Sequence, residues 1–259
     1  MRVLDLFSGI GGFSLGFERA GLQTVAFCEI DPFCRRVLAR HWPETPCYDD
    51  VRNLTAGRLA ADGLAVDVIC GGFPCQDISK AGPRTGLAGK RSGLWFEFAR
   101  VIGEIRPKFV VIENVTALRH RGLDVILRFF ASIRYDAEWH CVPAGSLGAP
   151  DIRDRIWVIA YPQHPDADSA GPHPADLHEQ RGAELFDGQE RIARPVLQAL
   201  PRRREGVGSA ARRDWHPEPG IRRVVDRTPE GVDRTRAIGN AVKPIIPEII
   251  GRAIMRAAA

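Results

Sequence analysis

Apolar and polar positions alternate in two different rhythms along the first part of the chain. Short apolar runs predict strands at residues 3–6, 24–29, 66–70, 109–113, 137–142 and 156–160. Between them, apolar residues three and four positions apart predict helices at residues 12–20, 32–41, 93–105 and 122–133. This alternation is typical of an α/β fold, in which helices cover both faces of a mainly parallel sheet.

The pattern dissolves between residue 162 and about residue 236. That stretch is rich in Pro, Gly, His and charged residues, and the pattern predicts one last helix at residues 245–255. At 259 residues, the chain is long enough for one large domain, or for one domain with a small companion.

Composition excludes several protein classes and adds one hint about a partner. With 44% hydrophobic and 26% charged residues, the chain is neither disordered, nor collagen-like, nor a small disulfide scaffold. The net charge of +4 is too small to indicate a nucleic-acid partner by itself. However, 32 of the 36 basic residues are Arg, whose planar fork suits phosphates and guanine edges. A coding bias explains the same excess.

The six cysteines and the hydropathy of the chain indicate a compartment. No pair has the CxxC spacing of a zinc or redox site, so we expect reduced thiols and no metal. The N-terminus lacks the pattern of a signal peptide, and no apolar run approaches the roughly 20 residues of a membrane span. We therefore expect a cytoplasmic protein without a membrane partner.

Glycines and carboxylates follow the first predicted strands. The segment DLFSGIGGF at residues 5–13 runs from a strand through a glycine-rich turn into a helix, whose free amides favour an anionic group. Its spacing differs from GxGxxG, so a simple tight turn is the alternative. Glu29 ends the second strand about 20 residues later, where an acidic residue suits ribose hydroxyls. With the acidic turn at Asp50, these strand ends suggest a nucleoside-type cofactor.

A thiol and a carboxylate follow two later strands. Cys75 lies in GGFPCQDIS at residues 71–79, where Pro74 stiffens the backbone and the glycines hold the thiol on a loop. Such a thiol is nucleophilic if nearby cations or helix amides lower its pKa. Glu113 ends an apolar strand, where partial desolvation favours the protonated, proton-donating form. Together they suggest a nucleophile and a general acid, although Cys75 could be structural and Glu113 a helix cap.

These segments together resemble the DNA cytosine-5 methyltransferase family, in its compact phage or prophage branch. The matching segments follow the family's order: DLFSGIGGF, Glu29, Asp50-Val51, GGFPCQDIS, SGLWFEFAR (92–100), ENV (113–115), RDRIWVIA (153–160) and AIGNAV (237–242). The resemblance implies a Rossmann-like, S-adenosylmethionine-dependent catalytic domain made of residues 1–161 and 236–259. Residues 162–235 would then be an inserted target-recognition region.

The resemblance also implies which residues bind S-adenosylmethionine. Phe7 and residues 9–11 would line the methionine and adenine pocket, Glu29 would hold the ribose hydroxyls, Ile30 would stack on the adenine, and Asp50 would accept its exocyclic amine. The last segment would fold back beside the first and complete the pocket. The full set is Asp5, Phe7, Ser8, Gly9, Ile10, Gly11, Gly12, Glu29, Ile30, Asp50, Val51, Pro74, Asn240, Ala241 and Val242.

The implied reaction is methyl transfer to C5 of a flipped-out cytosine in double-stranded DNA. Cys75 would add to C6, Glu113 would bind the N3 edge, and Arg155 would contact the base oxygen and help keep the thiolate charged. Arg153, the first Arg of the same motif, completes the catalytic set. Asp151 stands where the family has Gln. Expected DNA contacts are Gln76, Ser79, Arg202, Arg203, Arg212 and Arg213, the last four in a stretch with eight Arg and four acids between residues 201 and 227. A solvated loop is the alternative reading of that stretch.

Other functions remain open at this point. They are the tRNA-methylating branch of the family, a catalytically silent DNA-binding homologue, and a redox role for Cys70 and Cys75. The last cysteine is Cys141, so the Cys-Phe-Thr segment that marks the tRNA branch is absent. We expect a monomer with duplex DNA as partner and a cognate restriction endonuclease as a further possible partner.

Overall fold

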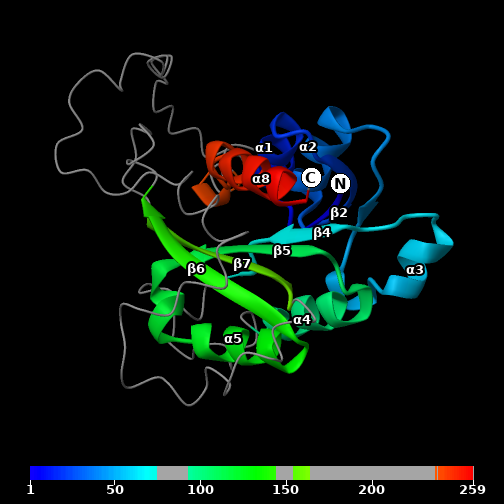
Figure 1. Cartoon of the computed structure of the whole chain (residues 1–259). Coiled ribbons are helices and arrows are strands. Elements are labelled where there is room, and N and C mark those ends of the chain that lie inside the picture. Colours follow the sequence, from blue (N-terminus) through cyan, green and yellow to red (C-terminus); the bar gives the residue numbers. More distant parts are fainter. Residues whose placement is uncertain (75–92, 144–153, 164–236, 238, 259) are drawn as a thin grey trace, which may run out of the picture.

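Seven strands form one sheet in the computed structural model, which describes residues 1–74, 93–143, 154–163, 237 and 239–258 (Figure 1). The strands follow the order β3-β2-β1-β4-β5-β7-β6. Their bounds are β1 (Arg2–Leu6), β2 (Gln23–Cys28), β3 (Cys47–Tyr48), β4 (Val68–Gly71), β5 (Phe109–Val115), β6 (Tyr135–Pro143) and β7 (Asp154–Pro162). The five neighbouring strands β3, β2, β1, β4 and β5 pair in parallel, while β7 is antiparallel to both β5 and β6. The predicted mainly parallel sheet is thus confirmed.

Helices flank this sheet on both faces, as predicted, with α1 and α8 on one side and α4 and α5 on the other (Figure 1). The bounds are α1 (Gly12–Arg19), α2 (Pro32–His41), α3 (Ala56–Ala61), α4 (Leu94–Ile105), α5 (Leu123–Ser132) and α8 (Ile245–Ala257), with 3₁₀ turns η1 (Val51–Asn53) and η3 (Thr116–His120). The sequence pattern predicted neither β3 nor α3, which are two and six residues long. Within the described ranges, none of the helices is both long and apolar enough to cross a bilayer.

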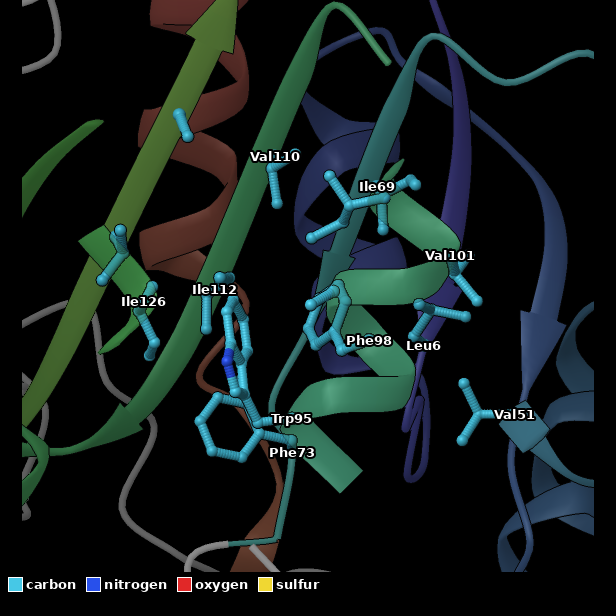
Figure 2. Close-up of a cluster of buried hydrophobic side chains, with 14 of the residues drawn as sticks. Leu6, Val51, Ile69, Phe73, Trp95, Phe98, Val101, Val110, Ile112 and Ile126 are labelled. Atoms are coloured by element: carbon cyan, nitrogen blue, oxygen red, sulfur yellow. The ribbon is translucent and has the colours of Figure 1, made fainter. Parts of the chain in front are cut away.

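Two hydrophobic clusters, one on each face, hold the helices to the sheet. One joins Leu6, Ile69 and Ile112 of the strands to Trp95 and Phe98 of α4, which Figure 2 shows lying against the strands. The other joins the opposite side chains of the same strands to α1 and α8. Because successive side chains of a strand point to opposite faces, a fully apolar strand serves both clusters.

The contact between α1 and α8 depends on a small residue. A Cβ atom on Gly16 would lie 2.3 Å from the Pro244 carbonyl oxygen and 2.7 Å from the Cβ of Pro247. The last helix therefore packs directly on the backbone of α1, and this packing brings the C-terminal segment beside the beginning of the chain.

We expect Gly16→Ala to lower the free energy of unfolding by about 1–3 kcal/mol, because the added methyl group overpacks this contact. Gly103→Ala in α4 is the matched control, since its Cβ would meet nothing within 4 Å. That change should raise stability by up to about 1 kcal/mol through helix propensity. Urea unfolding of both variants measures the difference, and equal shifts would contradict the close packing of α1 on α8.

Candidate active site

The candidate site lies at one edge of the sheet. The parallel strands β1, β2, β4 and β5 all end there, and the antiparallel β7 begins there, so Arg155 pairs with Val115 at the end of β5. Ligands of open α/β sheets bind at this carboxyl edge. The topology thereby brings together residues that are far apart in the sequence.

The glycine-rich turn between β1 and α1 has a left-handed backbone. Phe7, Gly9 and Gly11 have φ angles of 54°, 55° and 85°, and the Gly11 amide donates to the Ser8 carbonyl oxygen at 2.9 Å. A non-glycine residue in this region is uncommon, which marks Phe7 as held by its surroundings. The turn delivers the chain into α1 with its backbone open to a ligand.

Glu29 fastens this turn to the end of β2. Its two carboxylate oxygens accept hydrogen bonds from the backbone amides of Gly9, at 2.7 Å, and Asp31, at 2.8 Å. A carboxylate has about four acceptor sites, so each oxygen can still accept a hydroxyl donor. The neighbouring Ile30 exposes 64% of its surface, an unusual fraction for a large apolar residue and one that offers a face to a flat ring.

Asp5 is completely buried beneath the turn. Its Oδ2 accepts a hydrogen bond from the Ser14 hydroxyl of α1 at 2.7 Å, and its Oδ1 has no hydrogen-bond partner. Burial raises the pKa of the Asp5 carboxyl to about 7, against the opposing effect of the hydrogen bond from Ser14. Asp5 therefore holds the start of α1 in place beneath the turn.

This raised pKa makes stability depend on pH. Between about pH 4 and pH 7 the unfolded chain has lost the Asp5 proton while the folded chain keeps it, so stability falls as pH rises through this window. We expect Asp5→Asn to gain stability relative to the native protein by about 1.4 kcal/mol per pH unit across it. Urea unfolding at several pH values measures this slope. The exposed Asp124→Asn is the control, and parallel curves for the native protein and Asp5→Asn would contradict the prediction.

Asp50 lies at the beginning of η1, next to β3. Its carboxylate accepts a hydrogen bond from the Arg52 amide at 3.0 Å and pairs with the Arg52 guanidinium. These bonds lower the pKa of Asp50. A hollow of about 210 Å³ borders the same turn and is lined by Tyr48, Asp49, Asp50, Asn53, Leu54 and Arg58.

The C-terminal segment AIGNAV (237–242) lies beside the glycine-rich segment DLFSGIGGF (5–13). A Cβ atom on Gly12 would be 2.4 Å from the Val242 carbonyl oxygen, so the two backbones are in direct contact. Asn240 is exposed, and Ala241 and Val242 are half-buried. The fold thus brings the C-terminal segment to the glycine-rich turn, where the resemblance places it.

These features fit a nucleoside cofactor with an amino-acid tail such as S-adenosylmethionine. The turn leaves its backbone open, Glu29 retains acceptor capacity for ribose hydroxyls, and Ile30 presents an uncovered apolar surface. For metals, the described part of the chain holds no cluster of three or more His, Cys, Asp or Glu side chains suited to an ion. A second hollow, of about 530 Å³, lies at the opposite sheet edge near Met1 and Phe109, and none of the expected site residues lines it.

Glu113 and Arg155 form an ion pair at the same edge. The Arg155 Nε atom lies 2.7 Å from Glu113 Oε1, and the two side chains expose 26% and 13% of their surfaces. Gly72 leaves room for this carboxylate, because a Cβ there would lie 2.8 Å from Glu113 Oε2. The acid and the cation expected from the sequence are therefore in direct contact.

Asn114 connects the ends of β4 and β5. Its side-chain amide donates a hydrogen bond to the Phe73 carbonyl oxygen at 3.2 Å, and its Oδ1 accepts one from the Val115 amide at 2.9 Å. Phe73 is itself buried, with its ring 5.7 Å from that of Trp95. Phe73, one residue before Pro74, is thus held both by its carbonyl oxygen and by the packing of its ring.

Several expected site residues lie outside the described ranges: Cys75, Gln76, Ser79, Arg153, Arg202, Arg203, Arg212 and Arg213. Asp151 and nearly all of the expected recognition region lie outside them as well. Sequence reasoning missed the roles of Ser14, Asn114 and Arg100. Asn114 and Arg100 carried a signal, since they belong to the matching segments ENV (113–115) and SGLWFEFAR (92–100), whereas Ser14 carried none.

Comparisons with known proteins agree with this geometry. The family described as C-5 cytosine-specific DNA methylase matches residues 1–200. The type II methyltransferase M.DsaV of Dactylococcopsis salina is 32% identical over 166 residues, which cover 62% of this chain and 46% of that protein. M.AquIA of Picosynechococcus sp. is 29% identical over 216 residues, covering 77% of this chain and 87% of that protein. The chain thus spans about half the length of several curated relatives and most of another.

A solved structure shares this fold. It comes from an E. coli prophage and is described as a DNA modification methyltransferase; it aligns with a TM-score of 0.63 and 19% identity, covering 100% of this chain and 99% of that one. At this identity the likeness shows the fold alone, and the fold is the Rossmann-like methyltransferase fold expected from the sequence.

Proposed function

Because the chain belongs to the C-5 cytosine-specific DNA methylase family, we propose that it transfers a methyl group from S-adenosylmethionine to C5 of cytosine in duplex DNA. The observation that carries the proposal is the Glu113–Arg155 pair, held at the sheet edge where β4 leads toward Cys75. Glu29, Ile30 and the glycine-rich turn support the choice of cofactor.

Cytosine C5 needs activation before it can accept a methyl group. The Cys75 thiolate adds to C6, and the electrons of the C5–C6 double bond move onto C5. Glu113 binds the N3 edge and donates a proton there, while Arg155 contacts the base oxygen and holds Glu113 in place at 2.7 Å. When bound, S-adenosylmethionine would supply the electrophilic methyl group that C5 takes up. A base then removes the C5 proton, the double bond re-forms, Glu113 recovers the N3 proton, and the Cys75 thiolate leaves.

The target base must leave the duplex for this chemistry, since C6 is not accessible to a thiol within the stack. We propose that residues 162–235 read the target sequence and that Arg202, Arg203, Arg212 and Arg213 contact phosphates. The names of the relatives suggest a restriction-modification setting, and we extend it to this protein, acting as a cytoplasmic monomer.

Bisulfite sequencing tests the proposal directly. The protein is expressed in a bacterial host without cytosine-5 methylases, and DNA from the same host with an empty vector is the control. We expect protected cytosines in one recurrent sequence context. Unprotected DNA together with protected cytosines in transfer RNA would support the RNA-methylating alternative, and no protection in either nucleic acid would contradict methyl transfer altogether.

A further inference from the structure

Arg100 of α4 connects this helix to the turn that carries Asp50. One of its terminal nitrogens, Nη2, donates hydrogen bonds to the carbonyl oxygens of both Val51 and Leu54, each at 2.9 Å. These two carbonyl groups lie at the two ends of η1. The Val51 carbonyl oxygen also accepts the Leu54 amide at 3.2 Å, which closes the turn, whereas the Leu54 carbonyl follows the last residue of η1, where carbonyl groups lack partners within the helix. A single donor that reaches both carbonyl groups therefore fixes the turn as a unit.

Two carboxylates of α4 hold the guanidinium in this position. Arg100 Nε contacts Glu97 at 2.9 Å and Nη1 contacts Glu104 at 2.7 Å. The other oxygen of Glu104 accepts a hydrogen bond from the Ala56 amide at 2.9 Å. Residues 51–56 are therefore fastened to α4 at three backbone positions by one Arg–Glu pair.

The turn in question borders open space on one side and the core on the other. Val51 and Leu54 are 5% and 1% exposed and belong to the same cluster as Val101 of α4 (Figure 2). Asp50 directly precedes them and lines the hollow of about 210 Å³ together with Leu54. The place of the Asp50 carboxylate at this rim thus depends on how η1 is held.

We propose that Arg100 is a positioning residue for the adenine end of the cofactor. Arg100 fixes the position of η1 and thereby that of the Asp50 carboxylate, which accepts a hydrogen bond from the exocyclic amine of the adenine. This inference rests on the proposed function. The inference gives Arg100, a side chain of α4, a role in cofactor specificity that acts through η1 and not through contact with the cofactor.

The test compares two ligands that differ at the exocyclic position of the purine. S-adenosylhomocysteine carries the amine, whereas S-inosylhomocysteine carries an oxygen there. Calorimetric titration of the native protein should show a clear preference for the adenosyl ligand. We expect Arg100→Leu to bind S-adenosylhomocysteine about tenfold more weakly, a change of about 1.4 kcal/mol, and to lose much of this preference. Arg100→Lys should recover part of both.

Controls separate positioning from a general loss of structure. Arg128→Leu removes another Arg of a helix, paired with Asp124 on α5, and should change neither affinity. At saturating cofactor, Arg100→Leu should keep the native kcat and the native affinity for DNA. If Arg100→Leu folds poorly, Glu104→Gln replaces it in the test and should show a smaller loss of affinity for S-adenosylhomocysteine and of the preference for it. Equal weakening for both ligands, or no weakening, overturns the role of Arg100. A native protein that binds neither ligand overturns the proposed cofactor instead.

Discussion

Replacing Cys75 with serine is expected to lower the rate of methyl transfer by about a thousandfold or more, which corresponds to about 4 kcal/mol in the barrier. The serine hydroxyl stays protonated at neutral pH and is a far weaker nucleophile toward C6 than a thiolate. Affinity for S-adenosylmethionine should be unchanged, because the substitution leaves the neighbouring Pro74 in place and the other residues assigned to the cofactor belong to other strand ends. Transfer of a labelled methyl group to DNA measures the rate.

A covalent adduct provides the second measurement for Cys75. In 5-fluorocytosine, fluorine replaces the C5 proton that a base must remove before Cys75 can leave. Native protein, cofactor and 5-fluorocytosine DNA should therefore form a covalent complex that survives denaturing electrophoresis. The matched control is Cys141→Ser, since Cys141 is an exposed thiol on β6. This variant should form the adduct at the native rate. Native protein that binds cofactor and DNA yet never forms an adduct would contradict the mechanism.

The sequence predicted the elements that carry long regular patterns. The strands β1, β2, β4, β5, β6 and β7 and the helices α1, α2, α4, α5 and α8 were found within a few residues of their observed bounds. The two-residue β3 was missed because hydrophobic periodicity needs a longer window than two residues. Its place at the sheet edge depends on pairing with β2, which is a tertiary contact.

The candidate site was predicted only in part, for a related physical reason. Parallel strands put their carboxyl ends at one edge, so the meeting of Glu29 with the glycine-rich turn follows from topology. The hydrogen bonds of Asn114 to Phe73 and of Arg100 to Val51 join residues 41 and 49 positions apart. Nothing local in the sequence specifies such bonds. Asp5 likewise has the residue type of a ligand contact, and only the packing of α1 reveals its burial.

The ion pair at the sheet edge leads to the second large effect. We expect Glu113→Gln to lower kcat by about 10²- to 10⁴-fold, because glutamine keeps the size of the side chain but cannot donate a proton to N3 and recover it. Stability should change little, since Gln can still accept a hydrogen bond from Arg155. Single-turnover methylation with saturating DNA and cofactor separates this defect from weaker binding.

A double-mutant cycle with Arg155 decides whether the two side chains act as one unit. Arg155→Gln should also lower kcat, both through the lost contact to the base and because Glu113 loses the cation 2.7 Å away that fixes its position. If the pair acts jointly, the double variant loses less activity than the two single variants combined, since the second substitution removes a group that is already misplaced. Losses that simply multiply would show that Arg155 serves the base alone. In that case the orientation of Glu113 at the end of β5 would have to come from the strand itself and from its close contact with Gly72.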